Sequence, residues 1–246
     1  MKIKFSRGWM YMFREISIVV VGVLVAFMLN SWWMNAKEAR SRNIMLKNLA
    51  EEFVSNNQEL EQTLSIHEFV LRNTVALEQI LDKTPLNKLV TVPDTILTGV
   101  IIAATYNPAS GNINSFLNVS EQNGFGDNEL VASVASWSNA FDDASEDEQT
   151  GFHFIETQFL PYLRQQVNLT DILSNAGLWA RYAYTHARDD RLSDSFIQGT
   201  VEVNADIELK NLIAQRKLRL GIIIGALKRL QANQNQTLSL IKRNKP

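Results

Sequence analysis

The most restrictive feature of this 246-residue sequence is an uncharged run from Ile16 to Trp33. As a helix with a rise of about 1.5 Å per residue, this run would be about 27 Å long, close to the roughly 30 Å hydrocarbon core of a bilayer. Its valines do not argue against a helix, because a backbone in lipid must satisfy its own hydrogen bonds. We therefore predict a transmembrane helix over residues 16–34. We prefer it to a buried helix of a soluble protein or a cleaved signal peptide.

Aromatic and basic side chains flank this predicted span. Trp32 and Trp33 follow it, and Trp9 and Tyr11 precede it, in the pattern of interfacial aromatic belts. Basic residues are equally frequent on the two sides, so the positive-inside rule does not set the orientation. We expect the basic tail of residues 1–15 to stay inside, because its translocation is costly, and the rest of the chain to be periplasmic. The basic residues that we assign to the membrane interface are Lys37, Arg40 and Arg42.

A pair of small residues lies within the span. Gly22 and Ala26 are four residues apart and share one face of a helix, which would let a second helix approach closely. Small residues are also common in membrane helices that do not dimerise. This helix-dimer face is therefore a hypothesis for self-association.

The span also carries a sequence signature. Its positions are Glu15, Ile16, Gly22, Leu24, Ala26, Asn30 and Trp32. This order resembles the N-terminal signature of an uncharacterised bacterial family of single-pass membrane proteins of unknown function. The resemblance covers most of the chain, departs from the family pattern at Ser120, and implies a membrane anchor but no activity. Further matching positions are Leu46, Leu49, Glu52, Asn57, Leu60, Thr105 to Pro108, Ser115, Glu129, Leu130 and Trp137.

Two long helical segments with opposite charge follow the span. No Pro or Gly occurs between Ser31 and Thr84, and apolar residues recur there at intervals of three and four, which predicts one helix that ends near Asp82. Residues 44–82 contain seven acids and two bases (net −5), and residues 204–243 contain two acids and eight bases (net +6). We expect the two helices to pair antiparallel as a stalk, with a basic collar near anionic lipid.

The segment between these helices is predicted to form a small helical head. We expect helices over 96–105, 129–141 with Asn128 as N-cap, 151–167 with a break at Pro161, and 170–187, and an acidic loop over 142–150. The predicted fold class is therefore all-α. Its parts are a basic tail (1–15), a transmembrane helix (16–34), a first stalk helix (35–84), a helical head (85–200) and a second stalk helix (201–246).

Few residues in the sequence suggest a catalytic or metal-binding site. The absence of cysteine excludes disulfides and thiolate metal sites, and the sequence contains no phosphate-binding or dinucleotide-binding motif. His153 and Glu156 are three residues apart, but helical metal sites normally use two such pairs with Glu first. His67 on the predicted helix seam is more typical of a tolerated core residue than of a pH-sensitive one, and His186 has no visible catalytic partners. The acidic cluster, which we interpret as solvated rather than calcium-binding, comprises Asp142, Asp143, Glu146, Asp147 and Glu148.

These observations predict a non-enzymatic interaction or scaffold protein of the bacterial inner membrane. We expect no catalytic residue, metal or cofactor, and no nucleic-acid partner, since the basic helix is best matched by the acidic one. The expected partners are the lipid bilayer and either a second copy or another membrane-complex component. One alternative is a periplasmic sensor or accessory subunit, although a tail of about 15 residues is short for an effector. The other is an enzyme with a cryptic site within residues 105–190, where Tyr106, His153 and Glu156 would surround one cavity.

Overall fold

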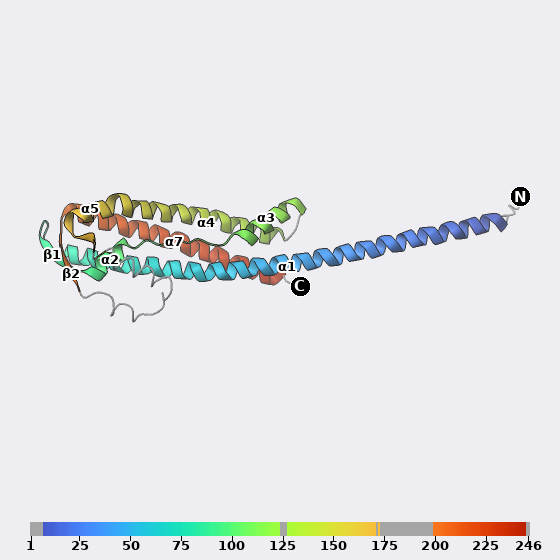
Figure 1. Cartoon of the computed structure of the whole chain (residues 1–246), viewed down its shortest axis with the longest axis horizontal. Helices are drawn as coiled ribbons and strands as arrows, with labels where there is room; N and C mark the ends of the chain where they lie inside the picture. The colour runs from blue at the N-terminus through green and yellow to red at the C-terminus, as the bar shows by residue number, and fades with distance from the viewer. Residues whose placement is uncertain (1–6, 124–126, 171, 173–198, 245–246) are drawn as a thin grey trace. The chain divides into compact units, whose positions relative to one another are not determined.

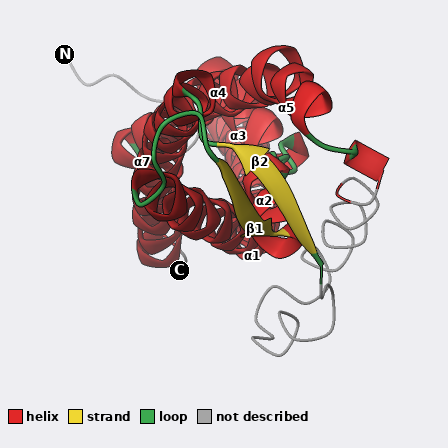
Figure 2. Cartoon of the chain, turned by 90° about the vertical axis from the view of Figure 1, so that its left-hand side faces the viewer, coloured by secondary structure: helices red, strands yellow, loops and turns green. Residues whose placement is uncertain are grey.

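The computed structural model describes residues 7–123, 127–170, 172 and 199–244. The chain divides into two units, Met1–Asn48 with Lys245–Pro246, and Leu49–Asn244. Helices dominate the described residues, and strands are few (Figures 1 and 2). The coarse prediction of a mostly helical protein is therefore confirmed.

Helix α1 extends from Arg7 to Asp82 without a break. Its end at Asp82 agrees with the prediction, and the turn before Pro85 explains it, because proline disfavours helical backbone at the preceding residue. From Arg14 to Ile44 every side chain is exposed, whereas buried side chains recur from Leu46 onward. The same helix therefore begins as an exposed segment in the first unit and continues as a core helix in the second.

The core of the second unit is built from three long helices. These are the part of α1 from Leu49, α4 (Asn128–Phe154) and α7 (Ile207–Asn244), which lie side by side in both views (Figures 1 and 2). On each helix the buried side chains recur every three or four residues and so form a stripe along one face. Gly151 permits close packing of α4 on α7, since a Cβ there would lie 2.7 Å from Ile223 Cδ1. The largest completely buried apolar side chains include Phe53, Leu60, Leu77, Phe116, Trp137, Phe154 and Phe159.

Shorter elements connect α1 to α4. They are β1 (Leu89–Pro93), α2 (Asp94–Ile101), a stretch without helix over 102–110, and α3 (Gly111–Asn123). The apolar run was predicted to be helical to Thr105, but α2 ends at Ile101 and its C-cap, Ile102, is extended. The buried Arg216 accounts for this early end, because its guanidinium donates to the carbonyl oxygens of Val100 and Ile102.

A two-stranded antiparallel sheet was not expected. Strand β1 pairs with β2 (Thr200–Asn204), with Leu89 opposite Asn204 and Pro93 opposite Thr200. The Val-Thr-Val triplet of β1 has strand propensity, but its partner is about 110 positions further along the chain. Local periodicity cannot reveal a pairing of that separation.

The prediction of an acidic loop over 142–150 is wrong, because this stretch lies within α4. Asp142, Asp143 and Glu146 are exposed, while Ala144 and Glu148 are buried. A run of acidic residues does not by itself indicate a loop, because an amphipathic helix can place acidic side chains on its solvent-exposed face. The predicted N-cap is wrong by one residue: the Asp127 carboxylate accepts from the Glu129 amide at 3.2 Å.

Helix α4 continues into a π-helical turn, η1 (Ile155–Phe159), and then into α5 (Leu160–Gln166). Helical structure continues through Pro161, the second residue of α5, so the predicted break is not seen there. Its missing N–H follows the π-helical turn, where the regular helical hydrogen-bond pattern is already interrupted. The buried face of this corner includes Phe159, Tyr162 and Leu163. Most of the helix predicted over 170–187 lies outside the described residues.

Candidate functional site

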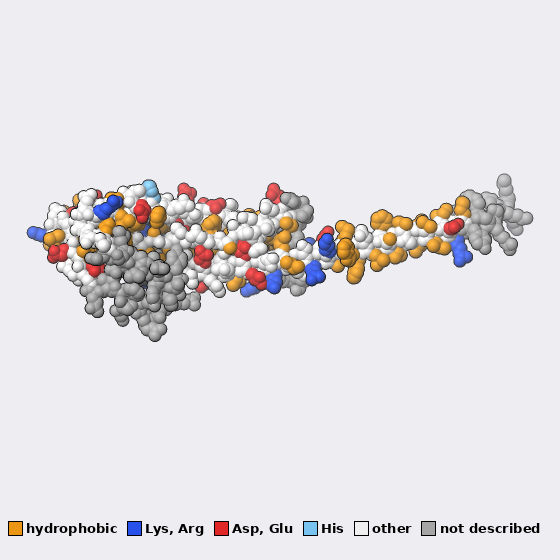
Figure 3. Space-filling view, viewed as in Figure 1, with side chains coloured by type: hydrophobic (Ala, Val, Ile, Leu, Met, Phe, Trp, Pro, Cys, Tyr) orange, Lys and Arg blue, Asp and Glu red, His pale blue; other side chains and the backbone are white. Residues whose placement is uncertain are grey.

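The first candidate site is the exposed apolar segment at the start of α1. By length and composition this segment could cross a membrane, and none of its most apolar stretch is buried (Figure 3). Exposed apolar side chains here are Ile16, Ile18, Val19, Val20, Val21, Val23, Leu24, Val25, Phe27, Met28, Leu29, Trp32, Trp33 and Met34. In aqueous solution water would contact all of these side chains, and exposure of so large an apolar surface to water is unfavourable.

Residues assigned to the membrane interface lie at the C-terminal end of this segment. Trp32 and Trp33 are exposed, and the Lys37 ammonium lies 5.7 Å from the centroid of the Trp33 ring. Arg40 and Arg42 are also exposed. The side chains of Trp9 and Tyr11 lie outside the described part of the chain. For the predicted dimer face, a Cβ at Gly22 would meet no atom within 4 Å, and Ala26 is exposed.

The second candidate is a buried polar network, which begins with His67 on α1. Its imidazole Nε2 lies 3.1 Å from Glu148 Oε1 on α4, and the two side chains are only 3% and 2% exposed. Glu148 Oε2 accepts the backbone N–H of Tyr106 at 3.0 Å. Within the described residues His67 Nδ1 has no hydrogen-bond partner. In a neutral imidazole, the tautomer protonated at Nε2 fits best, because it directs the only N–H at the carboxylate.

The network continues through Tyr106 to Gln234 on α7. Gln234 Oε1 accepts from the Trp137 indole at 2.9 Å and lies 3.4 Å from the Tyr106 hydroxyl. Gln234 Nε2 donates to the carbonyl oxygen of Phe53 at 3.0 Å, and the Tyr106 hydroxyl also lies 3.2 Å from the carbonyl oxygen of Asn56. Burial, with the charges of Glu59 and Glu148, raises the pKa of Tyr106 well above its ordinary value. The hydroxyl therefore stays protonated and donates at neutral pH.

A buried cation, Arg216, forms a third polar centre. Its Nη2 donates to Ile102 O at 2.7 Å and its Nε donates to Val100 O at 3.2 Å. Burial, and the nearby charge of Arg219, lower the pKa of Arg216 to about 10, so it remains charged at neutral pH. These carbonyls form the C-terminal end of α2, where a cation is favoured by the unpaired carbonyl groups. Arg216 is therefore explained as the cap of this helix.

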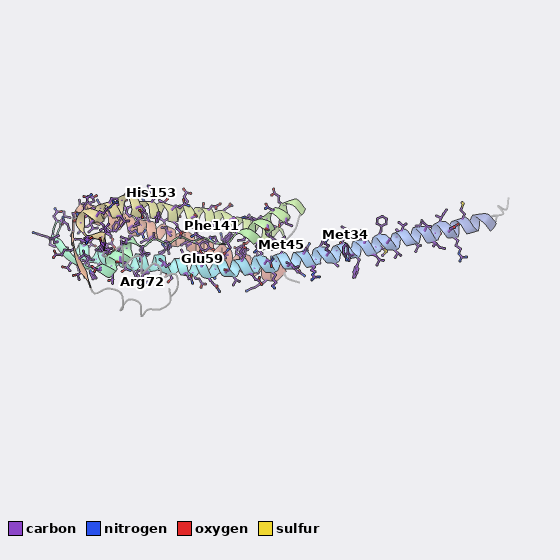
Figure 4. The ribbon with its side chains drawn as sticks, viewed as in Figure 1. Met34, Met45, Glu59, Arg72, Phe141 and His153 are labelled. Atoms are coloured by element: carbon purple, nitrogen blue, oxygen red, sulfur yellow. The ribbon has the colours of Figure 1, made fainter. Side chains whose placement is uncertain are left out.

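The surface residues considered for chemistry do not join this network. His153 lies on the outer side of α4 and is exposed, as is Glu156 on η1 (Figure 4). Tyr106 is buried instead, so the three side chains do not surround one cavity. Among the described residues, no group of three or more His, Asp or Glu side chains is arranged to hold a metal ion. His186 lies outside these residues.

Sequence reasoning missed Glu148, Gln234 and Arg216. A signal for all three was nevertheless present, because each lies on a buried heptad-like stripe. On α4 the stripe runs through Leu130, Val134, Trp137, the partly buried Phe141, Ala144, Glu148 and Gly151, and on α7 through Leu209, Ile213, Arg216, Leu220, Ile223, Leu227, Leu230, Gln234, Thr237 and Ile241. A polar residue at such a position predicts a buried hydrogen-bonding group.

Comparison with known proteins gives no assignment: no family model, no curated protein and no solved structure matches this chain. The resemblance to the uncharacterised membrane family therefore stays a prediction.

Proposed function

We propose that this protein is a single-pass inner-membrane protein of the bacterial envelope whose helical domain is a non-enzymatic interaction or scaffold module. The observation that carries the proposal is the helix α1, in which an exposed apolar segment (Ile16–Met34) precedes a segment that contributes Leu49, Phe53 and Leu60 to a packed core. A bilayer is the environment that removes such a segment from water. The basic tail stays in the cytoplasm, and the domain is periplasmic.

We further infer that α1 and α7 form an antiparallel stalk. Three contacts support this arrangement, because residues later in α7 meet residues earlier in α1. Lys217 pairs with Glu78 at 2.7 Å, Lys228 pairs with Glu68 at 2.8 Å, and Gln234 donates to the carbonyl oxygen of Phe53. Both ion pairs are at least partly exposed and contribute at most about 1 kcal/mol each. Apolar burial therefore supplies the stability, while opposite charge selects the pairing.

Two features favour an interaction module over an enzyme. The buried polar side chains hydrogen-bond to one another and to backbone groups, which gives them a structural role in fixing helix positions. The exposed face of α4, in contrast, carries Asp142, Asp143 and Glu146. This acidic surface suits a basic partner, since complementary charge steers association and discriminates between partners.

The experiment that tests this proposal is a topology assay on the full chain. A reporter active only in the periplasm is fused after Pro246, and membranes are washed with alkaline carbonate. Retention of the chain with an active reporter is the expected result, and cross-linking in cells should then trap a partner or a second copy. Release by carbonate would overturn the membrane anchor. An inactive reporter with retention would place the domain in the cytoplasm and overturn the periplasmic assignment.

A further inference from the structure

One stripe of α1 combines an interfacial aromatic ring with two cations. Trp33, Lys37 and Arg40 are separated by four and three residues, so they share one helix face, and all three are exposed. The Lys37 ammonium lies 5.7 Å from the Trp33 ring centroid. The ring face attracts the cation and holds it near the end of the apolar segment, so Lys37 is partly positioned before any ligand binds.

The charges on this stripe are not balanced by acids. Among the described residues, neither Lys37 nor Arg40 forms an ion pair, whereas Arg42 and Lys47 each already interact with another group of the chain. The nearest acid in sequence, Glu38, is one position from Lys37 and therefore lies about 100° away around the helix. Within the part of the chain that the structure describes, the stripe thus presents two cations without an ion pair.

The axial positions of these cations put Lys37 inside the headgroup layer and Arg40 close to its outer edge. Arg40 is seven residues beyond Trp33, which is a rise of about 10 Å along a helix. The headgroup layer of each leaflet is roughly 5–8 Å thick, and Trp prefers its inner boundary. With Trp33 at that boundary, Lys37 lies about 6 Å along the helix, within the layer, and Arg40 lies just beyond its outer edge, from which its long side chain can reach back to headgroup phosphates.

We propose that Trp33, Lys37 and Arg40 form a binding site for the headgroup of an anionic phospholipid, in the leaflet on the C-terminal side of the span. The Arg40 guanidinium can donate two parallel hydrogen bonds to phosphate oxygens, and the ammonium of Lys37 adds a point charge held by the ring. A zwitterionic headgroup brings a positive group to the same face and is disfavoured. This inference rests on the membrane anchor proposed above.

The test uses native mass spectrometry of the full chain in detergent micelles, titrated with phosphatidylglycerol or phosphatidylcholine. Wild type should retain phosphatidylglycerol at least tenfold more tightly than phosphatidylcholine. K37Q/R40Q should weaken phosphatidylglycerol binding by about 25-fold, or about fivefold per cation, while K37R/R40K should largely preserve it. The matched control is K83Q/K88Q, which removes the same charge from exposed positions in the second unit and should leave lipid binding unchanged.

Three outcomes would overturn the site. Wild type could fail to distinguish the two lipids, or K83Q/K88Q could weaken binding as much as K37Q/R40Q does, which would indicate net charge alone. Displacement of the lipid by millimolar glycerol 3-phosphate would assign the site to a soluble phosphate. Carbonate extraction of the membranes from which the wild-type chain is purified separates this inference from the anchor. Release of wild type overturns the proposed function, whereas retention without lipid preference overturns only the headgroup site.

Discussion

The indole Nε1 of Trp137 on α4 donates a 2.9 Å hydrogen bond to Oε1 of Gln234 on α7, and both side chains are almost completely buried. The Trp137 ring also packs edge-on against Phe53 of α1, with 5.2 Å between ring centroids. Gln234 reaches the same helix through the carbonyl oxygen of Phe53. One polar side chain therefore fixes the register of three helices, since a shift of any of them would leave a buried donor or acceptor unpaired.

The first prediction concerns Gln234. Gln234→Leu keeps the volume but leaves the Trp137 indole without its acceptor and removes the side-chain hydrogen bond to the Phe53 carbonyl. It should destabilise the full chain by about 2–4 kcal/mol, measured by urea unfolding in detergent micelles with near-ultraviolet circular dichroism. The exposed Gln236→Leu is the control and should change stability by less than about 0.5 kcal/mol. Equal effects of the two substitutions would show that the Gln234 hydrogen bonds do not stabilise the bundle.

The second prediction concerns the buried pair of His67 and Glu148. Either His67→Leu or Glu148→Leu leaves a buried polar partner unpaired and should cost about 3–5 kcal/mol. The double variant removes both groups, so it should cost about 1–3 kcal/mol less than the sum of the single effects. Denaturant unfolding of the four proteins in this cycle measures the coupling. Simple additivity would mean that the two side chains do not stabilise each other.

The third prediction concerns alkaline pH. The pKa of Tyr106 is raised, chiefly by burial, so this hydroxyl stays protonated when tyrosine in the unfolded chain ionises near pH 10. The unfolded chain therefore loses a proton that the folded chain keeps, and the corresponding stability, complete below about pH 10, is lost as the pH rises further. The lowered pKa of Arg216 acts in the opposite direction, so the informative quantity is the difference between wild type and Tyr106→Phe.

Tyrosinate absorbance at 295 nm checks this prediction directly. Between pH 9 and 11 the folded wild type and Tyr106→Phe should show the same increase in absorbance, because Tyr106 does not contribute while the chain is folded. A loss of about one quarter of the amplitude in Tyr106→Phe, corresponding to one of the four tyrosines other than Tyr162, would contradict it. Tyr162 should behave in the same way, since burial and its hydrogen bond to Asp206 raise its pKa.

The fourth prediction concerns the membrane segment. Leu24 and Val54 are both exposed in the structure, at 56% and 49%, so in water a lysine would be equally acceptable at either position. In a bilayer, Leu24→Lys places a charge near the centre of the span and should cost about 2.5–3.5 kcal/mol of insertion. We expect the fraction of chain resistant to carbonate extraction to fall for Leu24→Lys and to stay unchanged for Val54→Lys. Identical extraction of both variants would argue that residues 16–34 do not cross the membrane.

The long helices were predictable because their signals are local. The proline- and glycine-free stretch before Thr84 and the apolar intervals of three and four define α1, and the end of that helix at Asp82 was correct. The acidic stretch after Phe141 was predicted to be a loop because its charges were counted without regard to helical periodicity. At helical spacing, Glu148 falls on the same buried stripe as Val134 and Trp137, and it is buried in the structure.

The elements that depend on distant partners were not predictable in this way. Strand β1 exists because Val90 and Val92 lie opposite Val203 and Val201, and α2 ends early because Arg216 supplies donors to its last carbonyls. Each of these depends on a residue more than 100 positions away. Their energies come from pairings that exist only after the chain has folded.

The apolar segment, the extent of the long helices and their opposite net charges can be read from local sequence patterns, because hydrophobicity, helix breakers and charge act over a few neighbouring residues. The partners of the buried polar residues, in contrast, follow only from the folded structure. His67 meets Glu148, and Gln234 meets Trp137, because helix packing brings together stripes that are far apart in the chain, and burial favours the packing in which these donors find acceptors.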